Sequence, residues 1–386
     1  MSTRRRFLAG LALSPFMARS TWAKAGGGEQ LLFVGTGTTT GSKGIYAYHF
    51  DTARGELKAL GLAAEAPSPS FLALSPDGKF LFAVNEIDSY GGAKTGAVSS
   101  YSIHEPAGKL TLINTVASGG SGPCHINTDR TGQVLLVANY TGGSAASFLI
   151  GADGRLSNAV SEFHYDSHGA GPGQDKERQE AAHAHHATAS PNNRFVYIND
   201  LGLDCIHIYQ LDVETAKLTP NNPAEWKAAP GSGPRVLRFH PSGRWAYCVN
   251  ELASTVDLLG WDPATGTLTL IEETPLLPTD FKGISRAAEI IFDAKGMFAY
   301  VANRDDNFLM TFKIDGDTGK LSDPRQSPCG GMIPRHIALD LTDHWILVAN
   351  QDSNLIAIYR RDPKTGELAL TGPSFPIQSP QCLVFA

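Results

Sequence analysis

One short phrase recurs along the chain, and this repeat constrains the fold more than any other feature of the sequence. Clear copies begin at Ser75 (SPDGKFLFAVNE), His240 (HPSGRWAYCVNE) and Phe292 (FDAKGMFAYVANR), and a truncated copy, EQLLFVGT, begins at Glu29. The residues that close the apolar run of each copy, 47 to 61 positions apart, are Thr36, Asn85, Asn139, Asp200, Asn250, Asn303 and Asn350. Self-similarity at this period, with several short strands per unit, predicts an all-β chain folded as a seven-bladed β-propeller.

Each repeat is interpreted as four strands. An innermost strand such as Ala287–Phe292 leads through a polar turn into a second strand such as Trp245–Val249, which is nearly continuously apolar. That composition is typical of a strand covered on both faces. The third strands alternate in polarity and end in turns such as Asp262–Leu268, where Asp and Gly favour the turn geometry. We expect the fourth strand to be short and polar, as an exposed outer edge is.

The two ends of the folded chain are expected to meet in one blade. The fold begins at Leu31 with a strand of the second type, whereas a seventh innermost strand occurs only at Gln381–Phe385. We therefore predict that the C-terminal strand completes the first blade, which leaves no open sheet edge. One long interval holds Ser161–Ala182, a Gly-rich, charged insertion without a strand pattern. A functional loop and a tolerated surface insertion are both open for this segment.

The first 25 residues form a segment of a different kind. Thr3–Leu8 (TRRRFL) is a twin-arginine pattern, followed by an apolar stretch to about Met17 and a small-residue cleavage site at Ala23–Ala25. This pattern predicts an export signal over residues 1–25, a periplasmic location, and a single propeller domain over residues 26–386. The alternative for the segment is a basic, disordered tail.

The negative net charge of the chain limits the classes of molecule that it is expected to bind. The formal net charge is −6, and removal of the signal, with five basic and no acidic residues, leaves −11. An acidic chain argues against nucleic acid and anionic membranes as partners. No apolar run reaches the roughly 18 residues of a membrane span, and we expect a monomer or a weak homodimer.

The cysteines are scattered and show no C-x-x-C spacing, so neither a disulfide framework nor a zinc site is predicted. They are Cys124, Cys205, Cys248, Cys329 and Cys382.

Polar residues gather at the starts of the innermost strands. Because these starts face the central channel of a propeller, residues far apart in the sequence converge there. The segments are Pro123–His125, His183–His186, Pro234-Arg235, Ser285–Glu289 and Pro334–His336, and the ends of the second strands add Glu86, Tyr140, Asp200, Glu251, Arg304 and Gln351. Several Arg, His and Glu side chains at one channel mouth are costly to bury without a purpose.

The residue pattern alone leaves the chemistry open. His183, His185 and His186 are candidates for metal binding, but no carboxylates lie nearby at ligand spacing, so no metal site is predicted there. Cys124 and His125 are adjacent on a strand and point to opposite faces, which argues against a nucleophile–base pair. The sequence has no G-x-S-x-G turn and no phosphate-binding glycine loop, and we expect no cofactor.

Four segments resemble a known family. They are GPCHINTDRTGQVLLVANYTGGS (Gly122–Ser144), ERQEAAHAHH (Glu177–His186), GPRVLRFHPSGRWAYCVNELASTV (Gly233–Val256) and PRHIALDLTDHWILVANQDSNLI (Pro334–Ile356). Together they resemble the seven-bladed propeller lactonase family, which includes a bacterial 6-phosphogluconolactonase and fungal carboxy-muconate lactonizing enzymes, over about Gln30 to Ala386. Two residues depart from the family pattern. Ala182 stands where the family usually has Pro before His-x-His, and Val236 stands where Pro-Arg-His is usual.

The resemblance implies a metal-independent lactonase that is similar to 6-phosphogluconolactonase and acts on a sugar or carboxylated lactone in the channel. It places the catalytic positions at His185, Arg235 and Glu251, joined by Arg286 or Arg335. Lactone hydrolysis needs a base to activate water and positive donors for the oxyanion. His185 or Glu251 is the candidate base, and Arg235 and Arg286 are the candidate donors. The expected substrate-binding residues are His125, His183, Arg178, Arg335 and His336.

Two questions about function stay open at this point. A phosphorylated sugar lactone is a cytoplasmic metabolite, so either the substrate is an unphosphorylated sugar or aromatic-derived lactone, or the N-terminal segment is not a signal. The alternative function is a non-catalytic propeller that binds a ligand or protein at its channel, because propellers host unrelated functions. Retention of His185, Arg235, Glu251 and Arg286 together favours the enzyme. A quinone- or metal-dependent dehydrogenase would need ligand sets that the sequence does not show.

Overall fold

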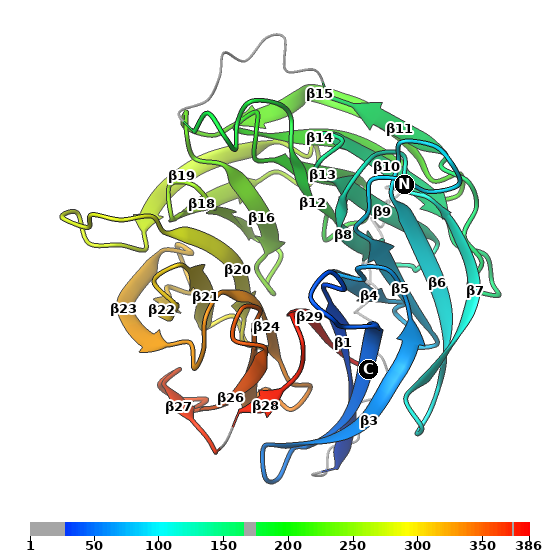
Figure 1. The fold of residues 1–386 in the computed structure, drawn as a ribbon. Coiled ribbons are helices and arrows are strands. Elements are labelled where there is room, and N and C mark those ends of the chain that lie inside the picture. Colours follow the sequence, from blue (N-terminus) through cyan, green and yellow to red (C-terminus); the bar gives the residue numbers. More distant parts are fainter. Residues whose placement is uncertain (1–27, 166–174, 373) are drawn as a thin grey trace, which may run out of the picture.

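The structure is a seven-bladed β-propeller, as the repeat predicts (Figure 1). The computed structural model describes residues 28–165, 175–372 and 374–386. The predicted export signal and its cleavage site lie outside these described residues. Within the described ranges, no helix is long and apolar enough to cross a membrane.

Each blade is an antiparallel sheet whose first-named strand lies at the channel. From the channel outward, blade 1 is β29 (Pro380–Phe385), β1 (Glu29–Thr36), β2 (Gly44–Asp51) and β3 (Glu56–Glu65); blade 2 is β4 (Leu72–Leu74), β5 (Phe80–Asn85), β6 (Ala97–His104) and β7 (Lys109–Ala117); blade 3 is β8 (Pro123–Thr128), β9 (Val134–Asn139), β10 (Ser144–Leu149) and β11 (Ser161–His164). Blade 4 is β12 (Ala184–Ala189), β13 (Phe195–Asp200), β14 (Cys205–Asp212) and β15 (Lys217–Lys227); blade 5 is β16 (Pro234–Phe239), β17 (Trp245–Asn250), β18 (Thr255–Trp261) and β19 (Leu268–Pro275). Blade 6 is β20 (Arg286–Phe292), β21 (Phe298–Arg304), β22 (Phe308–Ile314) and β23 (Leu321–Pro328); blade 7 is β24 (Pro334–Leu339), β25 (Trp345–Asn350), β26 (Leu355–Arg361) and β27 (Leu368–Leu370), with β28 (Phe375–Pro376) also paired to β26.

The predicted closure of the ring is confirmed. The C-terminal strand β29 pairs with β1, with Leu32 opposite Phe385 and Val34 opposite Leu383. The first blade therefore takes one strand from the end of the chain and three from its start, and the backbone groups of β1 find partners on both sides.

The second strand of each blade is apolar because both of its faces are covered by neighbouring blades. Every residue of β17 is buried, and Val249 and Leu258 of blade 5 belong to the same hydrophobic cluster as Ile290 and Val301 of blade 6. Equivalent clusters fill the other interfaces between blades, so the core is a ring of inter-blade layers around the channel.

Two expectations about the outer strands were wrong. The fourth strands of five blades are 8 to 11 residues long, because they continue to pair with the third strand beyond a β-bulge, as β15 does beside β14. The insertion Ser161–Ala182 was expected to contain no strand, yet it begins with β11, which pairs with β10. Phe163 of this strand packs on Tyr209 of blade 4 with ring centroids 4.4 Å apart, which anchors it.

In blades 3 and 5, the residue that closes the second strand ties it to the third strand. The side-chain amide of Asn250 donates to Thr255 Oγ1 (3.0 Å) and to Asp257 Oδ2 (2.9 Å). The amide of Asn139 donates to Ser144 Oγ (3.0 Å) in the same way. Five blades have a buried Asn at this position, whereas blade 1 has Thr36 and blade 4 has Asp200.

We expect Asp257→Asn to stabilise the protein at pH 8. Burial raises the pKa of Asp257 to about 6, so the folded state holds a proton between about pH 4 and 6 that the unfolded chain releases. Stability from this group is therefore present at low pH and lost as the pH rises through that window. The amide variant should gain about 1–3 kcal/mol over wild type at pH 8 and much less at pH 4.5, measured by urea unfolding. An equal difference at both pH values would contradict this explanation.

Candidate active site

The innermost strands share an irregularity that decides which residues reach the channel. Six of them have a β-bulge at their start, seen as a register shift against the second strand between Pro123/His125, Ala184/His186, Pro234/Val236, Ala287/Glu289, Pro334/His336 and Pro380/Cys382. The extra residues at these bulges are Cys124, His185, Arg235, Ala288, Arg335 and Gln381. A bulged residue has no partner opposite it, so its side chain is freed from the normal alternation, and bulges often re-aim side chains at active sites.

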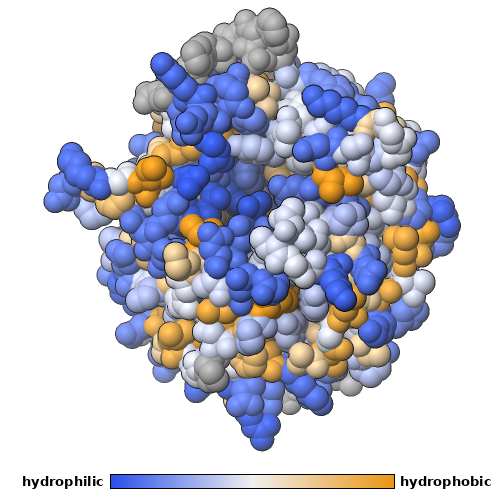
Figure 2. Space-filling view, viewed as in Figure 1, coloured by the Kyte–Doolittle hydropathy of each residue, from blue (hydrophilic) through white to orange (hydrophobic). Residues whose placement is uncertain are grey.

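A pocket in the channel collects five of these six residues. It is a narrow recess with a cavity volume of about 10 Å³, and it is lined by Phe71, Cys124, His125, His185, Arg235, Val236, Glu289, Arg335 and Gln381. The face of the molecule seen in Figure 2 is hollowed near its middle, and the hollow is surrounded by hydrophilic residues. The bulges therefore bring residues that lie about one repeat apart in the sequence together in a single polar site.

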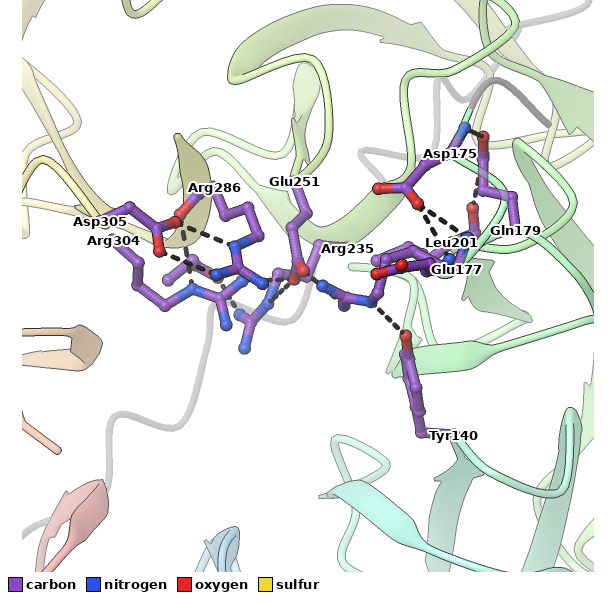
Figure 3. A network of polar contacts seen from close by, with 12 residues as sticks. Tyr140, Asp175, Glu177, Gln179, Leu201, Arg235, Glu251, Arg286, Arg304 and Asp305 are labelled. Atoms are coloured by element: carbon purple, nitrogen blue, oxygen red, sulfur yellow. Dashed lines mark hydrogen bonds and ion pairs between the residues drawn. The ribbon is translucent and has the colours of Figure 1, made fainter. Parts of the chain in front are cut away.

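Glu251 is the centre of a buried charge cluster beside this pocket (Figure 3). Its carboxylate is completely buried and forms ion pairs with Arg178 Nη2 (2.6 Å), Arg235 Nε (2.9 Å) and Arg304 Nη2 (2.6 Å). Arg235 also donates to the carbonyl of Ala288. Arg178 comes from the insertion in blade 3 and also donates from Nε to Tyr140 Oη (3.0 Å). Two blades and one insertion thus meet at one carboxylate.

The surroundings of Glu251 make it a weak base. Burial raises the pKa of this carboxyl, but the guanidinium groups of Arg304, Arg235 and Arg178 outweigh it and hold the pKa well below its ordinary range. Burial, followed by the charge of Arg304, lowers the pKa of Arg235 to about 10, and Arg235 stays protonated at neutral pH. Glu251 is therefore ionised and fully occupied as a counter-ion.

His185 differs from Glu251 in being uncharged. Its side chain is buried at the pocket wall, and among the described residues its Nδ1 has no hydrogen-bond partner. Burial, together with the positive charge of Arg235, holds the pKa of His185 well below its ordinary value. The ring of Tyr140 meets it edge-on, with centroids 5.6 Å apart. The imidazole is therefore neutral at physiological pH and has one ring nitrogen without a partner, while the guanidinium group beside it weakens it as a base.

Two further arginines at the channel mouth have different partners. Arg286, a predicted catalytic residue, forms a bidentate ion pair with Asp305 (2.9 and 2.8 Å) at the rim. Arg304, which was not among the predicted site residues, is the third arginine on Glu251. A signal for it existed in the repeat, because Arg304 follows Asn303 as Glu251 follows Asn250. Glu251 and Arg304, each one residue after that Asn in neighbouring blades, lie next to each other at the channel mouth.

Arg335 is the least committed guanidinium at the pocket. Its nearest polar partners are Gln351 Oε1 at 3.3 Å and Glu86 Oε2 at 3.8 Å. It lines the pocket with Arg235 and His185 and is about a quarter exposed. A positive group with weak internal partners can pair with an incoming oxyanion or carboxylate.

The predicted substrate-binding histidines are largely occupied by the protein itself. The ring of His183 stacks on Tyr140 (4.3 Å between centroids), and its nitrogens lie 3.0 Å from the Tyr140 carbonyl and 3.0 Å from Glu180 Oε1. His125 stacks between Phe71 and His186, and its Nδ1 accepts the amide of Ala187 (3.2 Å).

His336 accepts the amide of Leu383 at Nδ1 (3.4 Å) and lies 3.9 Å from Glu289 Oε2. Burial lowers its pKa to about 4, so it is neutral at physiological pH. Of the three histidines predicted to bind substrate, only His125 lines the pocket.

Cys124 lines the pocket but lacks the character of a nucleophile. Its thiol points at the carbonyls of His185 (3.4 Å) and Ala184 (3.7 Å), and burial raises its pKa far above the ordinary value. A protonated, buried thiol is inert.

Comparisons with known proteins all find lactonases. A family model described as "Lactonase, 7-bladed beta-propeller" matches residues 31–385. The chain is 33% identical over 315 residues to the 6-phosphogluconolactonase of Bacillus subtilis, covering 82% of this chain and 86% of that protein. It is also 33% identical over 326 residues to the 6-phosphogluconolactonase of Formosa agariphila, covering 82% and 88%. Among solved structures, the periplasmic gluconolactonase of Pseudomonas aeruginosa superposes with a TM-score of 0.86 at 34% identity, over 93% of this chain and 99% of that one.

Proposed function

The chain belongs to the seven-bladed β-propeller lactonase family, and on this premise we propose that it hydrolyses a sugar lactone in its channel without a metal. The observation that carries the proposal is the pocket where bulges bring His185, Arg235 and Arg335 together. It combines a neutral proton acceptor with two positive groups, which is what acyl transfer to water needs.

The reaction follows from these roles. A ring nitrogen of His185 removes a proton from a water molecule as the water oxygen attacks the lactone carbonyl carbon. The carbonyl oxygen becomes an oxyanion, which Arg335 and Arg235 stabilise by charge-assisted hydrogen bonds. When the tetrahedral intermediate collapses, the ring C–O bond breaks and the imidazolium returns its proton to the departing alkoxide. The product is the open-chain hydroxy acid.

Glu251 acts in this scheme as a positioning residue. Its carboxylate fixes Arg235 and Arg178 at 2.9 and 2.6 Å, and this holds Arg235 at the pocket wall. A preorganised donor needs no reorientation when charge develops on the substrate.

The charge of the channel mouth supports a substrate or product with an anionic group. Five guanidinium groups (Arg178, Arg235, Arg286, Arg304 and Arg335) share three carboxylates (Glu251, Asp305 and Glu86). A locally positive site on an acidic protein attracts anions such as an aldonate carboxylate. We propose an exported enzyme for an unphosphorylated aldonolactone, supported by the twin-arginine pattern and by the relative named as a periplasmic gluconolactonase.

A substrate screen tests the proposal. Purified protein of residues 26–386 is assayed for acid release from glucono-1,5-lactone, its 6-phosphate and a muconolactone, with and without EDTA. We expect hydrolysis of the unphosphorylated sugar lactone that EDTA does not reduce. A folded protein that hydrolyses none of the three would favour the non-catalytic binding propeller, and preference for the phosphorylated lactone would overturn the proposed substrate and location.

Arg335→Gln should lower kcat/KM by about 10–100-fold on the accepted lactone. The change removes a charge-assisted hydrogen-bond donor at the pocket. Within the protein it breaks only the weak contacts with Gln351 and Glu86, so the variant should fold. Arg286→Gln is the comparison, because Asp305 already neutralises that guanidinium, and its loss should stay below tenfold. Steady-state kinetics that show the larger loss for Arg286→Gln would reverse the assignment of these two arginines.

A further inference from the structure

Blade 4 departs from the other blades at positions that hold side chains of the metal-ligating kind. Its second strand ends in Asp200, where five other blades have Asn. On its third strand, Cys205 and His207 stand where blade 5 has Thr255 and Asp257, at the same distances from the end of the second strand. The hydrogen-bonded network of blade 5 is thereby replaced by a carboxylate, a thiol and an imidazole.

These side chains lie on one face of the sheet. Cys205 and His207 are two residues apart on β14, so they project to the same side. Asp200 is directly opposite Cys205 on β13, and Glu225 is directly opposite His207 on β15. The ligand atoms of Cys205, His207 and Glu225 all lie within 4.8 Å of one another. Three neighbouring strands therefore contribute to one cluster.

The ligand atoms that are mutually close belong to Cys205, His207 and Glu225, and Asp200 approaches this group through His207. His207 Nε2 is 3.6 Å from Cys205 Sγ and 3.6 Å from Asp200 Oδ2. Ligand atoms bound tetrahedrally to zinc at about 2.0–2.3 Å are about 3.3–3.7 Å apart. Glu225 is exposed and pairs with Lys227 through Oε1 (3.2 Å), so its carboxylate can adjust from the surface side.

The carboxylate of Asp200 points independently to a cation. Asp200 is completely buried, and its Oδ1 accepts the amides of His183 (2.8 Å) and Leu203 (3.0 Å). Among the described residues its Oδ2 has no hydrogen-bond donor, although in blade 5 the equivalent atom is an amide nitrogen with two acceptors. A buried carboxylate oxygen without a donor is costly unless a positive charge faces it.

The surroundings already shield part of the cluster from solvent. Cys205 is buried, and the ring of Tyr165 stacks on His207 with centroids 3.8 Å apart and planes within 7°. The hydroxyl of Tyr165 is held by Tyr209 Oη at 3.0 Å. The imidazole is thus fixed by packing against blade 3, which favours a preorganised site.

We propose that Cys205, His207 and Glu225, joined by the neighbouring carboxylate of Asp200 as the fourth ligand, bind one thiophilic divalent ion such as Zn²⁺. Thiolate and imidazole ligands select zinc and its neighbours over Mg²⁺ and Ca²⁺. Binding releases the thiol proton of Cys205, so affinity rises with pH. The ion ties three strands of blade 4 together, and through Asp200 it holds the amide of His183, where the segment carrying His185 begins. Its role is structural and separate from the proposed hydrolysis.

The test uses metal-free protein of residues 26–386, titrated with Co²⁺ and Zn²⁺. We expect one Co²⁺ per chain with a thiolate-to-cobalt charge-transfer band, displacement by Zn²⁺, and a Zn²⁺-dependent rise in Tm of a few degrees. The double variant Asp200→Asn with Cys205→Thr gives blade 4 the residue types of blade 5 and should fold, but it should lose both the band and the rise in Tm. Glu273→Gln, at the equivalent place in blade 5, is the matched control and should keep both.

Two outcomes would overturn the site. One is no charge-transfer band and no rise in Tm for wild type. The other is cobalt binding that persists unchanged in the double variant, which would move the metal to the channel histidines. Lactone hydrolysis is measured in parallel, and its absence in a protein that shows the band would refute the proposed function while leaving the metal site standing.

Discussion

Replacing His185 by alanine should lower kcat/KM on any lactone that the protein accepts by about 10²–10⁴-fold, the range typical for loss of a general base. The physical reason is that His185 offers a neutral imidazole at the pocket, with Nδ1 free of any partner among the described residues, whereas Glu251 is saturated by three arginines. A thousandfold loss corresponds to about 4 kcal/mol of transition-state stabilisation. Steady-state kinetics on the folded variant measure it.

The neighbouring residue provides the control. His186 lies on the same strand and is equally buried, but it does not line the pocket. His186→Asn should therefore cost less than tenfold in kcat/KM, provided that circular dichroism and Tm show a folded protein. Equal losses for the two variants would mean that β12 is only structural, and unchanged turnover in His185→Ala would remove it from the mechanism.

The pH profile gives a second measurement of the same assignment. Only the neutral imidazole can accept a proton, and burial with Arg235 nearby holds its pKa well below the ordinary 6.5. The plateau of kcat/KM should therefore continue as the pH falls through 6.5, with the decline only at lower pH, because kcat/KM reports the free enzyme. A half-maximum at or above pH 6.5 would contradict this environment for His185.

Glu251→Gln should destabilise the protein by about 3–5 kcal/mol and also abolish most activity. The amide keeps the shape of the carboxylate but leaves Arg178, Arg235 and Arg304 close together around an uncharged group. Removing one partner of a buried ion pair leaves charge uncompensated in a poorly solvated place, which is far worse than losing a surface pair. Urea unfolding at pH 7 measures the change.

Asp305→Asn is the matched control for this prediction. It also removes a carboxylate from an arginine, Arg286, but that pair is partly exposed at the rim, so the change should be below about 1 kcal/mol. Combining Glu251→Gln with Arg304→Met should recover part of the lost stability, because one repelling charge is gone. Strictly additive losses in the double variant would contradict charge repulsion as the cause.

The contribution of Glu251 also has a defined pH dependence. Its pKa in the folded state lies below the ordinary 4.5, so its stabilising effect is present above that pH and is lost as the pH falls through the folded-state pKa. The difference in stability between wild type and Glu251→Gln should therefore shrink in acid. A constant difference down to pH 3 would argue against the ion pairs as its source.

Much of the architecture could be predicted because it depends on local patterns. Apolar second strands such as β17 have the composition of strands covered on both faces, and the late innermost strand β29 indicates closure with β1. The outer strands were predicted less well. Strand β15 has a mixed composition, and its length depends on pairing with β14 beyond a bulge, which composition does not reveal.

The sequence predicted which residues lie at the candidate site better than it predicted how they pair. His185, Arg235, Glu251 and Arg178 do meet, but the third arginine on Glu251 is Arg304. Arg286, predicted as a donor to the oxyanion, is paired with Asp305. Which of several arginines reaches a given carboxylate depends on side-chain geometry between blades, and residues one repeat apart have no local pattern that records it.

The sequence by itself determined the number of blades, the closure of the ring and the positions at which polar residues face the channel, because these depend on repeat spacing and on the burial of alternating or continuous apolar strands. Only the tertiary structure decided how those residues act. The bulges turn His185, Arg235 and Arg335 into the pocket. Burial keeps His185 neutral, and three arginines keep Glu251 ionised. The pairing of β13, β14 and β15 brings Asp200, Cys205, His207 and Glu225 to one face. Protonation and pairing depend on distances of a few ångströms between residues of different strands, and such distances exist only after the ring has closed.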